Sequence, residues 1–336
     1  MQVKLLEKDE YFHLERSLHL HPLQSYAWGE VKSPSWMPMR IGVFKDETPV
    51  SAFSILTRKI PIFGKSFGYI PRATLCENSE ACKEVFEQLN IFCKNQKLSH
   101  ILLDPDLSFS DAEQQNSSVE LLLHEIGFIK QKRQIQPNRT VVLDLSKSEE
   151  ELFSEMRSKH RQYIRKAKRD GVRIRLGKDR DLEVFCEVIK SIIAVKGHVM
   201  HDCGYYKKVW ELFSKADRAV LFVAERDNAV LGSYMIILND DNAYEMYGGC
   251  NEEGNRLRAN YLMKWEAINY CKKLGKKYYD QWGAEPWYPG LVQFKEGFGG
   301  KILEYPSQYV YIYDRAAYTM YKFLERVNRI KQNLPF

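Results

Sequence analysis

Apolar and polar residues follow one another in the first hundred positions in an order that predicts a defined set of elements. The turn residues Asp46-Glu47-Thr48-Pro49 separate two runs with strand-like patterning, so a hairpin is expected there. Apolar side chains at helical spacing follow further along the chain. The predicted elements are a helix at 8–20, a short helix at 24–33 that ends before Pro34, strands at 39–45, 50–57 and 65–70, a helix at 80–97 and a buried strand at 100–106.

The second half of the chain repeats this order. A strand, a turn at Asp227-Asn228 and a second strand occupy 221–238, and they are followed by a strand at 242–250, an amphipathic helix at 259–273 and a strand at 276–283. The segment VFKDETPVSAFSIL of the first hairpin also resembles VAERDNAVLGSYMIIL of the second. Coincidence is the plain alternative, but similarity at long period favours a duplicated unit.

The order of elements in each copy matches the acyltransferase fold called GNAT. We therefore predict an α/β (α+β) chain of two tandem GNAT-like acyltransferase domains with mixed sheets. The first domain is expected over 1–150, on the side of the acceptor substrate. The second is expected over 151–336, with a basic helix at its start and the catalytic groups.

Composition narrows the class of protein. The 336 residues are 44% hydrophobic and 28% charged, which excludes disordered and collagen-like chains. The seven cysteines are scattered without a CxxC pair, so we expect reduced thiols and no zinc site. The N-terminal residues lack the apolar core of a secretory signal, and no window approaches 18 apolar residues. We expect a cytoplasmic protein.

The excess of cations is local. Residues 157–178 hold ten Lys or Arg and one acid, Asp170, within a net charge of +6 for the whole chain. Such a segment attracts phosphates, with affinity that falls as salt rises. The partner is a tRNA, a nucleotide-linked substrate or an anionic membrane, and the plain alternative is a solvated helix face. The candidate phosphate-binding residues are Arg157, Lys159, Arg161, Arg165 and Lys168.

The segment QFKEGFGG, 293–300, places Lys295 beside Phe294 and before a glycine-rich turn. A lysine near an apolar ring presents its charge in a dehydrated pocket, where it stabilises an oxyanion. From the residues alone, a surface lysine before a loop is the simpler interpretation. Tyrosines cluster in GYYKKVWELF, 204–213, and YEMYGGC, 244–250, where phenols line a polar pocket or pack in the core.

The sequence lacks the motifs of several enzyme and cofactor-binding classes. The glycines fit neither a Walker loop nor a dinucleotide fingerprint, and there is no GxSxG. His198 and His201 lack the spacing and the acidic partner of a zinc protease motif, so we expect no metal site. The segment 251–260, NEEGNRLRAN, is a poor cradle for the pyrophosphate of coenzyme A. We therefore expect no cofactor, and an acyl donor other than coenzyme A.

The chain resembles the FemABX family of peptidyltransferases, which build the interpeptide bridge of peptidoglycan, over nearly its whole length. Without a long coiled-coil insertion in its second half, it is most similar to the FemX type. The segment 138–174, with a strand ending in LDL, an acidic helix start and a basic helix ending in RDGV, is the most specific match. The other matching segments are WGEVK at 28–32, YIPRA at 69–73, LLDPD at 102–106, LFVAERDNAVLGSYMIIL, YEMYGGC and QFKEGF.

The resemblance implies an aminoacyltransferase that moves an amino acid from aminoacyl-tRNA to the stem-peptide amine of a UDP-linked or lipid-linked peptidoglycan precursor. It also implies the site. Phe294 and Lys295 match a Phe-Lys pair near the reaction centre, and Lys295 would steady the oxyanion. The residues assigned to substrate binding are Lys32, Tyr206 and Tyr247, together with Trp28 and Arg72 from the matching segments.

Two positions depart from the family pattern and bear on the acceptor. Asp202 stands where the family has an arginine, and Leu102 replaces the arginine of Arg-x-Asp-Pro. Two other functions stay open at this point. One is a GNAT-like N-acyltransferase that acts on a non-peptidoglycan amine, and the other is a non-catalytic RNA-binding module. The basic amphipathic helix at 315–333 packs on its own domain or rests peripherally on an anionic membrane, and packing is preferred.

Overall fold

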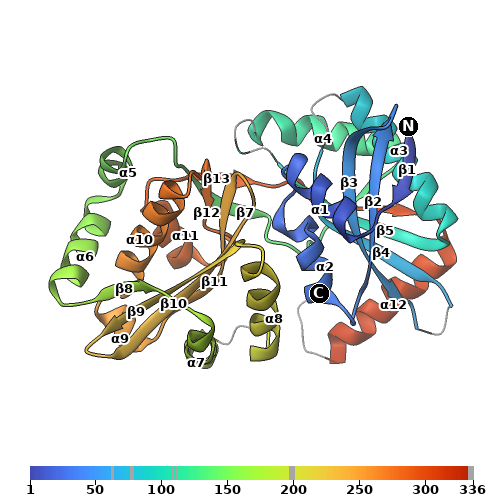
Figure 1. The fold of residues 1–336 in the computed structure, drawn as a ribbon. Coiled ribbons are helices and arrows are strands. Elements are labelled where there is room, and N and C mark those ends of the chain that lie inside the picture. Colours follow the sequence, from blue (N-terminus) through green and yellow to red (C-terminus); the bar gives the residue numbers. More distant parts are fainter. Residues whose placement is uncertain (62–63, 76–78, 108, 110–111, 197–200, 332–336) are drawn as a thin grey trace. The chain divides into compact units, whose positions relative to one another are not determined.

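The computed structural model describes residues 1–61, 64–75, 79–107, 109, 112–196 and 201–331. Contacts divide the chain into two units, residues 1–136 with 305–336, and residues 137–304. Each unit is built on one mixed sheet of seven strands among the described residues. Figure 1 shows the C-terminal helix in red among the blue and cyan elements of the first unit.

The first sheet carries helices on both faces. Its strands are, in spatial order, β1 (Gln2–Leu5), β2 (Met37–Lys45), β3 (Thr48–Lys59), β4 (Ser66–Ala73), β5 (Leu98–Pro105), β14 (Tyr309–Ile312) and β6 (Ile129–Lys130). The helices are α1 (Lys8–Ser17), the 3₁₀ turn η1 (Pro22–Gln24), α2 (Tyr26–Lys32), α3 (Ser79–Asn95), α4 (Ala112–Ile126) and α12 (Arg315–Lys331). Helix α3 buries Val85, Phe86 and Leu89 against Ile55 and Ile101 of the sheet, as its helical apolar spacing predicts.

The second sheet repeats the first strand by strand. In spatial order it holds β8 (Arg173–Leu176), β9 (Ala219–Arg226), β10 (Ala229–Leu238), β11 (Asn242–Cys250), β12 (Tyr278–Asp280), β7 (Arg139–Asp144) and β13 (Lys301–Glu304). In both sheets the fourth and fifth strands, β4 with β5 and β11 with β12, pair in parallel. All other neighbours are antiparallel. The two sheets therefore share the same strand order and the same strand directions, which confirms the predicted duplication.

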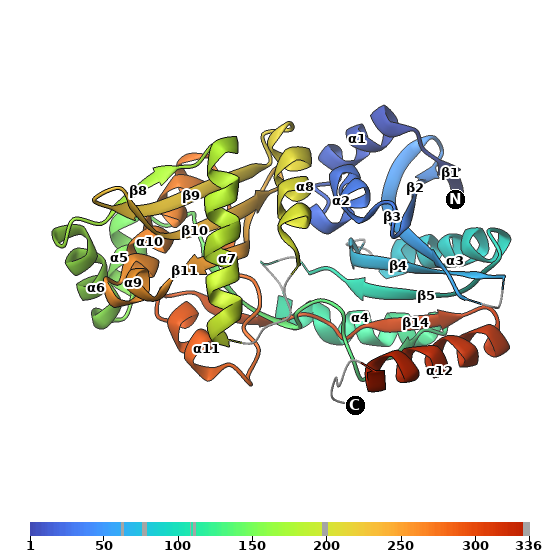
Figure 2. The same cartoon turned by 90° about the horizontal axis from the view of Figure 1, so that it is seen from below.

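The helices of the second unit are α5 (Glu149–Glu155), α6 (Ser158–Arg169), the 3₁₀ turn η2 (Asp179–Asp181), α7 (Leu182–Lys196), α8 (Cys203–Ser214), α9 (Glu252–Arg256), α10 (Ala259–Lys273) and α11 (Pro289–Glu296). Helix α10 buries Leu262, Met263 and Ile268 in the same cluster as Tyr234 and Ile236 of β10. Helix α6 packs on α10, and α7 packs against β10 and β11 (Figure 2).

The two hairpin turns explain why the hairpins were predictable. Asp46 and Glu47 have φ of 49° and 63°, and Asp227 and Asn228 have φ of 50° and 63°. Two consecutive residues in the left-handed region match the twist of the flanking strands, and Asp and Asn tolerate that region better than most side chains. Each turn therefore sets the register of its hairpin.

The predicted boundary at residue 150 differs from the division that the structure shows. Strand β7 precedes residue 150 but lies between β12 and β13 of the second sheet. Strand β14 follows residue 304 but lies between β5 and β6 of the first sheet. Each sheet therefore takes its sixth strand from chain segments that a single cut would assign to the other unit.

Helix α12 packs on protein, as preferred from its sequence, but on the first unit and not on the second domain, 151–336, to which the sequence analysis assigned it. Tyr318 and Tyr321 contact the ring of His100, at 4.9 and 4.5 Å between centroids, and Tyr321 also contacts Phe67 at 4.7 Å. Burial lowers the pKa of His100 to about 3, so the ring is neutral in this cluster. No helix among the described residues has the length and apolar character needed to cross a bilayer.

The cysteines contradict one expectation. Cys186 of α7 and Cys203 at the start of α8 form a disulfide, with 5.5 Å between their Cα atoms, although reduced thiols were expected. The two helices pack together, which brings these cysteines within bonding distance. Cys82, Cys93, Cys250 and Cys271 are buried, and Cys76 lies outside the described residues.

Candidate functional site

Lys295 lies near the end of α11 and is only 7% exposed. Its ammonium group donates to the carbonyl oxygen of Trp282 and, at 2.7 Å, to that of Gly283. Both acceptors follow β12 in left-handed backbone, with φ of 52° and 46°. A non-glycine residue such as Trp282 rarely adopts this conformation, which costs energy. The lysine is therefore an anchored, buried cation and not a surface residue before a loop.

Phe294 provides an apolar wall beside this cation. Its ring contacts Tyr261 and Phe298, at 5.0 and 5.3 Å between centroids, and the backbone oxygen of Phe294 bonds His160 Nε2 at 3.0 Å. Burial lowers the pKa of His160, so its imidazole is neutral near pH 7. The Phe-Lys pair thus lies where aromatic rings exclude water, and exclusion of water strengthens electrostatic interactions.

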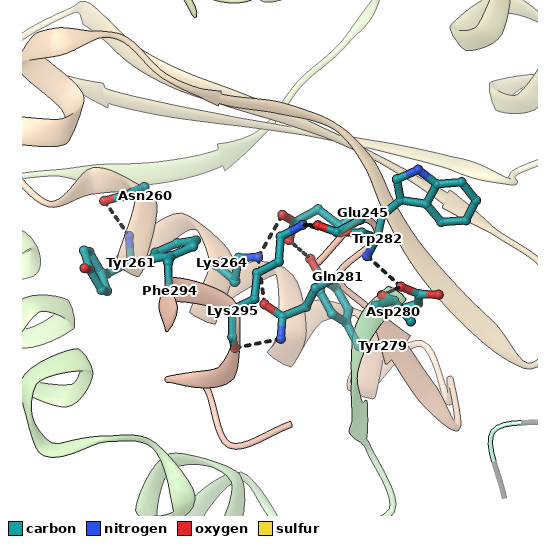
Figure 3. A network of polar contacts seen from close by, with 12 residues as sticks. Glu245, Asn260, Tyr261, Lys264, Tyr279, Asp280, Gln281, Trp282, Phe294 and Lys295 are labelled. Carbon is teal, nitrogen blue, oxygen red and sulfur yellow. Dashed lines mark hydrogen bonds and ion pairs between the residues drawn. The ribbon is translucent and has the colours of Figure 1, made fainter. Parts of the chain in front are cut away.

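A second buried lysine, which the sequence analysis did not single out, lies in the same region (Figure 3). Lys264 of α10 is fully buried, and its ammonium donates to Glu245 and Gln281, each at 2.9 Å. Glu245 also accepts from the hydroxyl of Tyr279 at 2.7 Å. Burial lowers the pKa of Lys264, and the negative charge of Glu245 opposes that shift. The signal was present, since Lys264 shares its helical face with two apolar residues, four and seven positions later.

The predicted tyrosines form a separate cluster on α8 and β11. Tyr206 is 2% exposed, and its ring lies 5.2 Å from that of Tyr247. The hydroxyl of Tyr247 is 3.1 Å from that of Tyr205, and the ring of His201 stacks on Tyr205 at 3.7 Å. Burial raises the pKa of Tyr205 to about 12, so its phenol stays neutral and able to donate. His198, the partner considered for a metal site, lies outside the described residues.

Asp202, one of the departures from the family pattern, has a structural role. Its side chain accepts from the backbone N–H of Tyr205 at 2.8 Å and caps the N-terminus of α8. Aspartate is a strong N-cap because it satisfies a backbone donor that lacks a partner within the helix. Leu102, the other departure, is buried in β5 opposite Val310 of β14.

The predicted substrate residues of the first unit lie in two environments. Lys32 ends α2, and its ammonium lies 4.4 Å from the ring centre of Trp28. Burial lowers the pKa of Lys32 to about 8. Arg72 is 2% exposed, and its guanidinium lies 3.4 Å from the ring centre of Tyr305. The geometry of Arg72 therefore fits a structural role inside the unit better than direct binding of a substrate.

Buried polar groups surround Arg72. Asp104 accepts from the hydroxyl of Tyr69 and from Gln308, the latter at 2.8 Å. Burial raises the pKa of Asp104, while the charge of Arg72 opposes the shift. This network ties β4 and β5 to the segment before β14, which supports the first unit as a scaffold.

Most of the basic segment, 157–178, forms α6, which carries its cations on the outside, whereas Arg173 and Arg175 lie in strand β8. His160, Ile164 and Ala167 form the buried face. Of the five predicted residues, Lys159, Arg165 and Lys168 are exposed, as is Arg157 at the N-cap. Arg161 instead donates to the carbonyls of Ser154, at 2.7 Å, and Met156, and so supports α5.

The start of α6 contacts the helix that carries Lys295. The backbone N–H of Arg157 donates to the carbonyl of Gly297 at 2.9 Å, and its guanidinium lies 3.3 Å from Glu296. His160 bonds the backbone of Phe294, as described above. The structure therefore brings the basic helix and the Phe-Lys pair together in one unit. Among the described residues, no group of three His, Cys, Asp or Glu is arranged to hold a metal ion.

Comparison with known proteins gives one family and several relatives. The model of the FemAB family matches residues 6–229 and 223–326. A lipid II:glycine glycyltransferase of Staphylococcus aureus is 24% identical over 262 residues, which are 76% of this chain. The match spans 58% of that relative's length, so the chain covers little more than half of it.

Solved structures agree in fold. The crystal structure of FemX matches with a TM-score of 0.84 and 19% identity, over 95% of this chain and 99% of that one. A tandem GNAT protein from the clavulanic acid pathway matches with a TM-score of 0.57 and 11% identity, over 93% of this chain and 98% of that one. These likenesses confirm the prediction of two tandem GNAT-like domains.

Proposed function

The chain belongs to the FemAB family, and from this we propose that it is an aminoacyltransferase of cell-wall bridge formation. In the proposed reaction, an amino acid moves from aminoacyl-tRNA to the stem-peptide amine of a peptidoglycan precursor, either UDP-linked or lipid-linked. The S. aureus relative supports this choice, because its name describes a glycyl transfer to lipid II.

The observation that carries the proposal is the buried ammonium of Lys295. When an amine attacks the aminoacyl ester, the carbonyl oxygen gains a negative charge in the tetrahedral intermediate. A cation that is already fixed, as Lys295 is by two carbonyl groups, stabilises that charge without reorganisation during the reaction. The ring of Phe294 keeps the environment apolar, where the interaction is strongest.

The donor is proposed to bind along α6. The exposed Lys159, Arg165 and Lys168 offer positive charge to the phosphates of a tRNA. Because the start of this helix contacts α11, the proposed donor-binding helix and Lys295 belong to the same unit. Arg157 fits this role and also links the two helices, whereas Arg161 fits a structural role.

Roles in acceptor binding are proposed for two pairs of residues, each within its own unit: Lys32 with Trp28, and Tyr206 with Tyr247. A partly buried ammonium suits a diphosphate, and neutral phenols suit the polar groups of a peptide or sugar. Holding the aminoacyl ester close to the acceptor amine supplies much of the rate. The proton of the amine goes to a carboxylate of the substrate or to a ribose hydroxyl of the tRNA. We infer no dedicated protein base.

This proposal also places the chain in the cell. Aminoacyl-tRNA is a cytoplasmic substrate, so the chain is proposed to act in the cytoplasm. With a lipid-linked acceptor it would act peripherally, at the inner face of the plasma membrane.

The test is a transfer assay with several donors and acceptors. The chain is incubated with labelled aminoacyl-tRNAs and with UDP-linked or lipid-linked muropeptides of several stem compositions, followed by mass analysis. We expect a product heavier by one amino acid residue. Transfer only from an acyl thioester, or only to a non-peptidoglycan amine, would identify a different acyltransferase, and tight RNA binding without any transfer would identify a binding module.

A further inference from the structure

Lys264 lies in a fully buried, largely aromatic environment, which lysines rarely occupy. The rings of Phe294 and Phe298 lie 5.0 and 5.6 Å from its ammonium. Removing an ammonium from water is costly, and an apolar side chain of similar volume at such a site is often neutral or stabilising. Stability alone therefore gives little reason for a lysine here.

The contacts of Lys264 fix the orientation of one side-chain amide. An ammonium group has donors and no acceptor, so the atom of Gln281 that faces it must be the oxygen, at 2.9 Å. The amide nitrogen of Gln281 then faces the other way, and it donates to the backbone oxygen of Lys295 at 3.0 Å. Gln281 is fully buried, so water does not compete for either contact.

The segment that Lys264 orients holds Lys295 at two points. Gln281 binds the backbone of Lys295, and the next two residues, Trp282 and Gly283, accept from its ammonium. Because these three residues are consecutive, a shift of Gln281 moves the carbonyls that anchor the ammonium. Figure 3 shows the two lysines with Gln281 and Trp282 in one network.

Glu245 keeps Lys264 in place. Its carboxylate accepts from Lys264 at 2.9 Å with one oxygen and from Tyr279 at 2.7 Å with the other. The hydroxyl of Tyr279 thus restrains the carboxylate, and the carboxylate restrains the lysine. This chain of contacts runs from β11 and β12 through α10 to α11, and all of it lies within the second unit.

We propose that Lys264 is a positioning residue that acts on Lys295 through the amide of Gln281. It does not touch the reacting atoms. It orients the amide that fixes the backbone of Lys295, and with it the carbonyls that hold the ammonium of Lys295. This inference rests on the proposed function only where activity is measured, because the mechanical link itself has a readout without substrates.

The first test is hydrogen exchange measured by mass spectrometry. The variant Lys264→Met with Glu245→Gln removes the ion pair without leaving a buried lone charge, and Gln281→Met removes the link alone. Lys272→Met is the matched control, since Lys272 lies on the same helix and donates to the carbonyl of Leu145 at 3.0 Å. We expect exchange in peptides covering 281–299 to rise about tenfold or more in both test variants, with strands 219–238 unchanged.

Unchanged exchange over 281–299 would overturn the proposal. Equal acceleration over 219–238 would do the same, because it would show that Lys264 only contributes to the stability of the unit. Neither outcome depends on finding a substrate, so this test separates the failure of the inference from a failure of the proposed function.

The second test is a double-mutant cycle with Lys295→Ala in the transfer assay. We expect the Lys264→Met, Glu245→Gln variant to lower kcat about tenfold with KM for both substrates unchanged, and to have no further effect in the Lys295→Ala background. A residue that acts through another loses its effect when that residue is absent. Losses that multiply in the combined variant would contradict an action through Lys295.

Discussion

Three lysines show how environment changes what one side chain does. Lys295 is held by backbone carbonyls, Lys264 is enclosed with a carboxylate, and Lys32 lies over an indole ring. Sequence patterns identified two of them, because they lie in segments that resemble a family. Lys264 is set apart by its burial, which its place among apolar residues of α10 indicates in the sequence but which becomes certain only in the folded chain, because lysines are rarely buried.

Lys32 gives a prediction about pH. Its pKa of about 8 means that raising the pH through 8 removes its charge, whereas an ordinary lysine keeps its charge to about pH 10. If Lys32 binds the diphosphate of the acceptor, affinity is nearly full at about pH 7, is about halved at pH 8 and falls about tenfold by pH 9. Calorimetric titration of UDP-MurNAc-pentapeptide at constant ionic strength measures this.

The variant Lys32→Arg is the control, because a guanidinium stays charged throughout the range. It should bind with an affinity that does not change between pH 7 and pH 9. An affinity of the unchanged chain that is constant up to pH 10 would show that Lys32 does not bind the acceptor as a cation.

At the scale of elements, α6 offers a test of the donor site. Arg165 and Lys168 are exposed on this helix, and Lys166 lies between them but pairs with Asp170 at 2.8 Å. Replacing Arg165 and Lys168 by Ala should weaken tRNA binding and reduce the slope of log Kd against log salt by about 1.5 in total. Filter binding over a series of salt concentrations measures both quantities.

Lys166→Ala is the matched variant for this helix, since its charge is already compensated by Asp170. It should change the slope by much less. If the Arg165, Lys168 variant binds tRNA as the unchanged chain does, the cations of α6 form a solvated face and the donor binds elsewhere.

Local signals explain why many elements were predictable. Helix α10 has the predicted bounds, 259–273, and both hairpin turns lie at the predicted residues. These features depend on neighbours in sequence. The places of β7 and β14 depend on pairing with strands far along the chain, and each is a short apolar run without a turn signal to identify its partner. Sequence patterns therefore gave the repeated unit but placed the boundary at 150.

The residues of the candidate site also fall into those that the sequence predicted and those that only the fold brings together. Phe294 and Lys295 are neighbours in sequence, so a motif was enough to find them. The residues that hold Lys295, namely Gln281, Trp282 and Gly283, come from the end of another strand, and they meet α11 only in the folded chain. The backbone carbonyls of Trp282 and Gly283 have no sequence signature at all.

At the scale of the whole molecule, the places of β7 and β14 in the two sheets predict which fragments of the chain fold. A fragment of residues 137–304 retains all seven strands of the second sheet. A fragment of residues 151–336 lacks β7, so β12 and β13 lose the strand between them and expose unpaired backbone groups. We expect cooperative thermal unfolding of the first fragment and none of the second, as measured by circular dichroism.

A chain truncated after residue 304 tests the first sheet in the same way. It loses β14, which lies between β5 and β6, and α12, which covers His100. We expect the first unit of this truncated chain to unfold while the second keeps its melting temperature. Normal stability of both units would show that β14 and α12 contribute little to the stability of the first unit.

The central claim is that the ammonium of Lys295 stabilises charge during aminoacyl transfer. The measurement that tests it most directly is the single-turnover rate of transfer from aminoacyl-tRNA to a muropeptide, with Lys301→Ala as the control because Lys301 is an exposed lysine on the next strand. We predict that Lys295→Ala lowers this rate by more than about 10²-fold, as loss of one oxyanion donor does, with tRNA binding retained. A rate near that of the unchanged chain would contradict the claim.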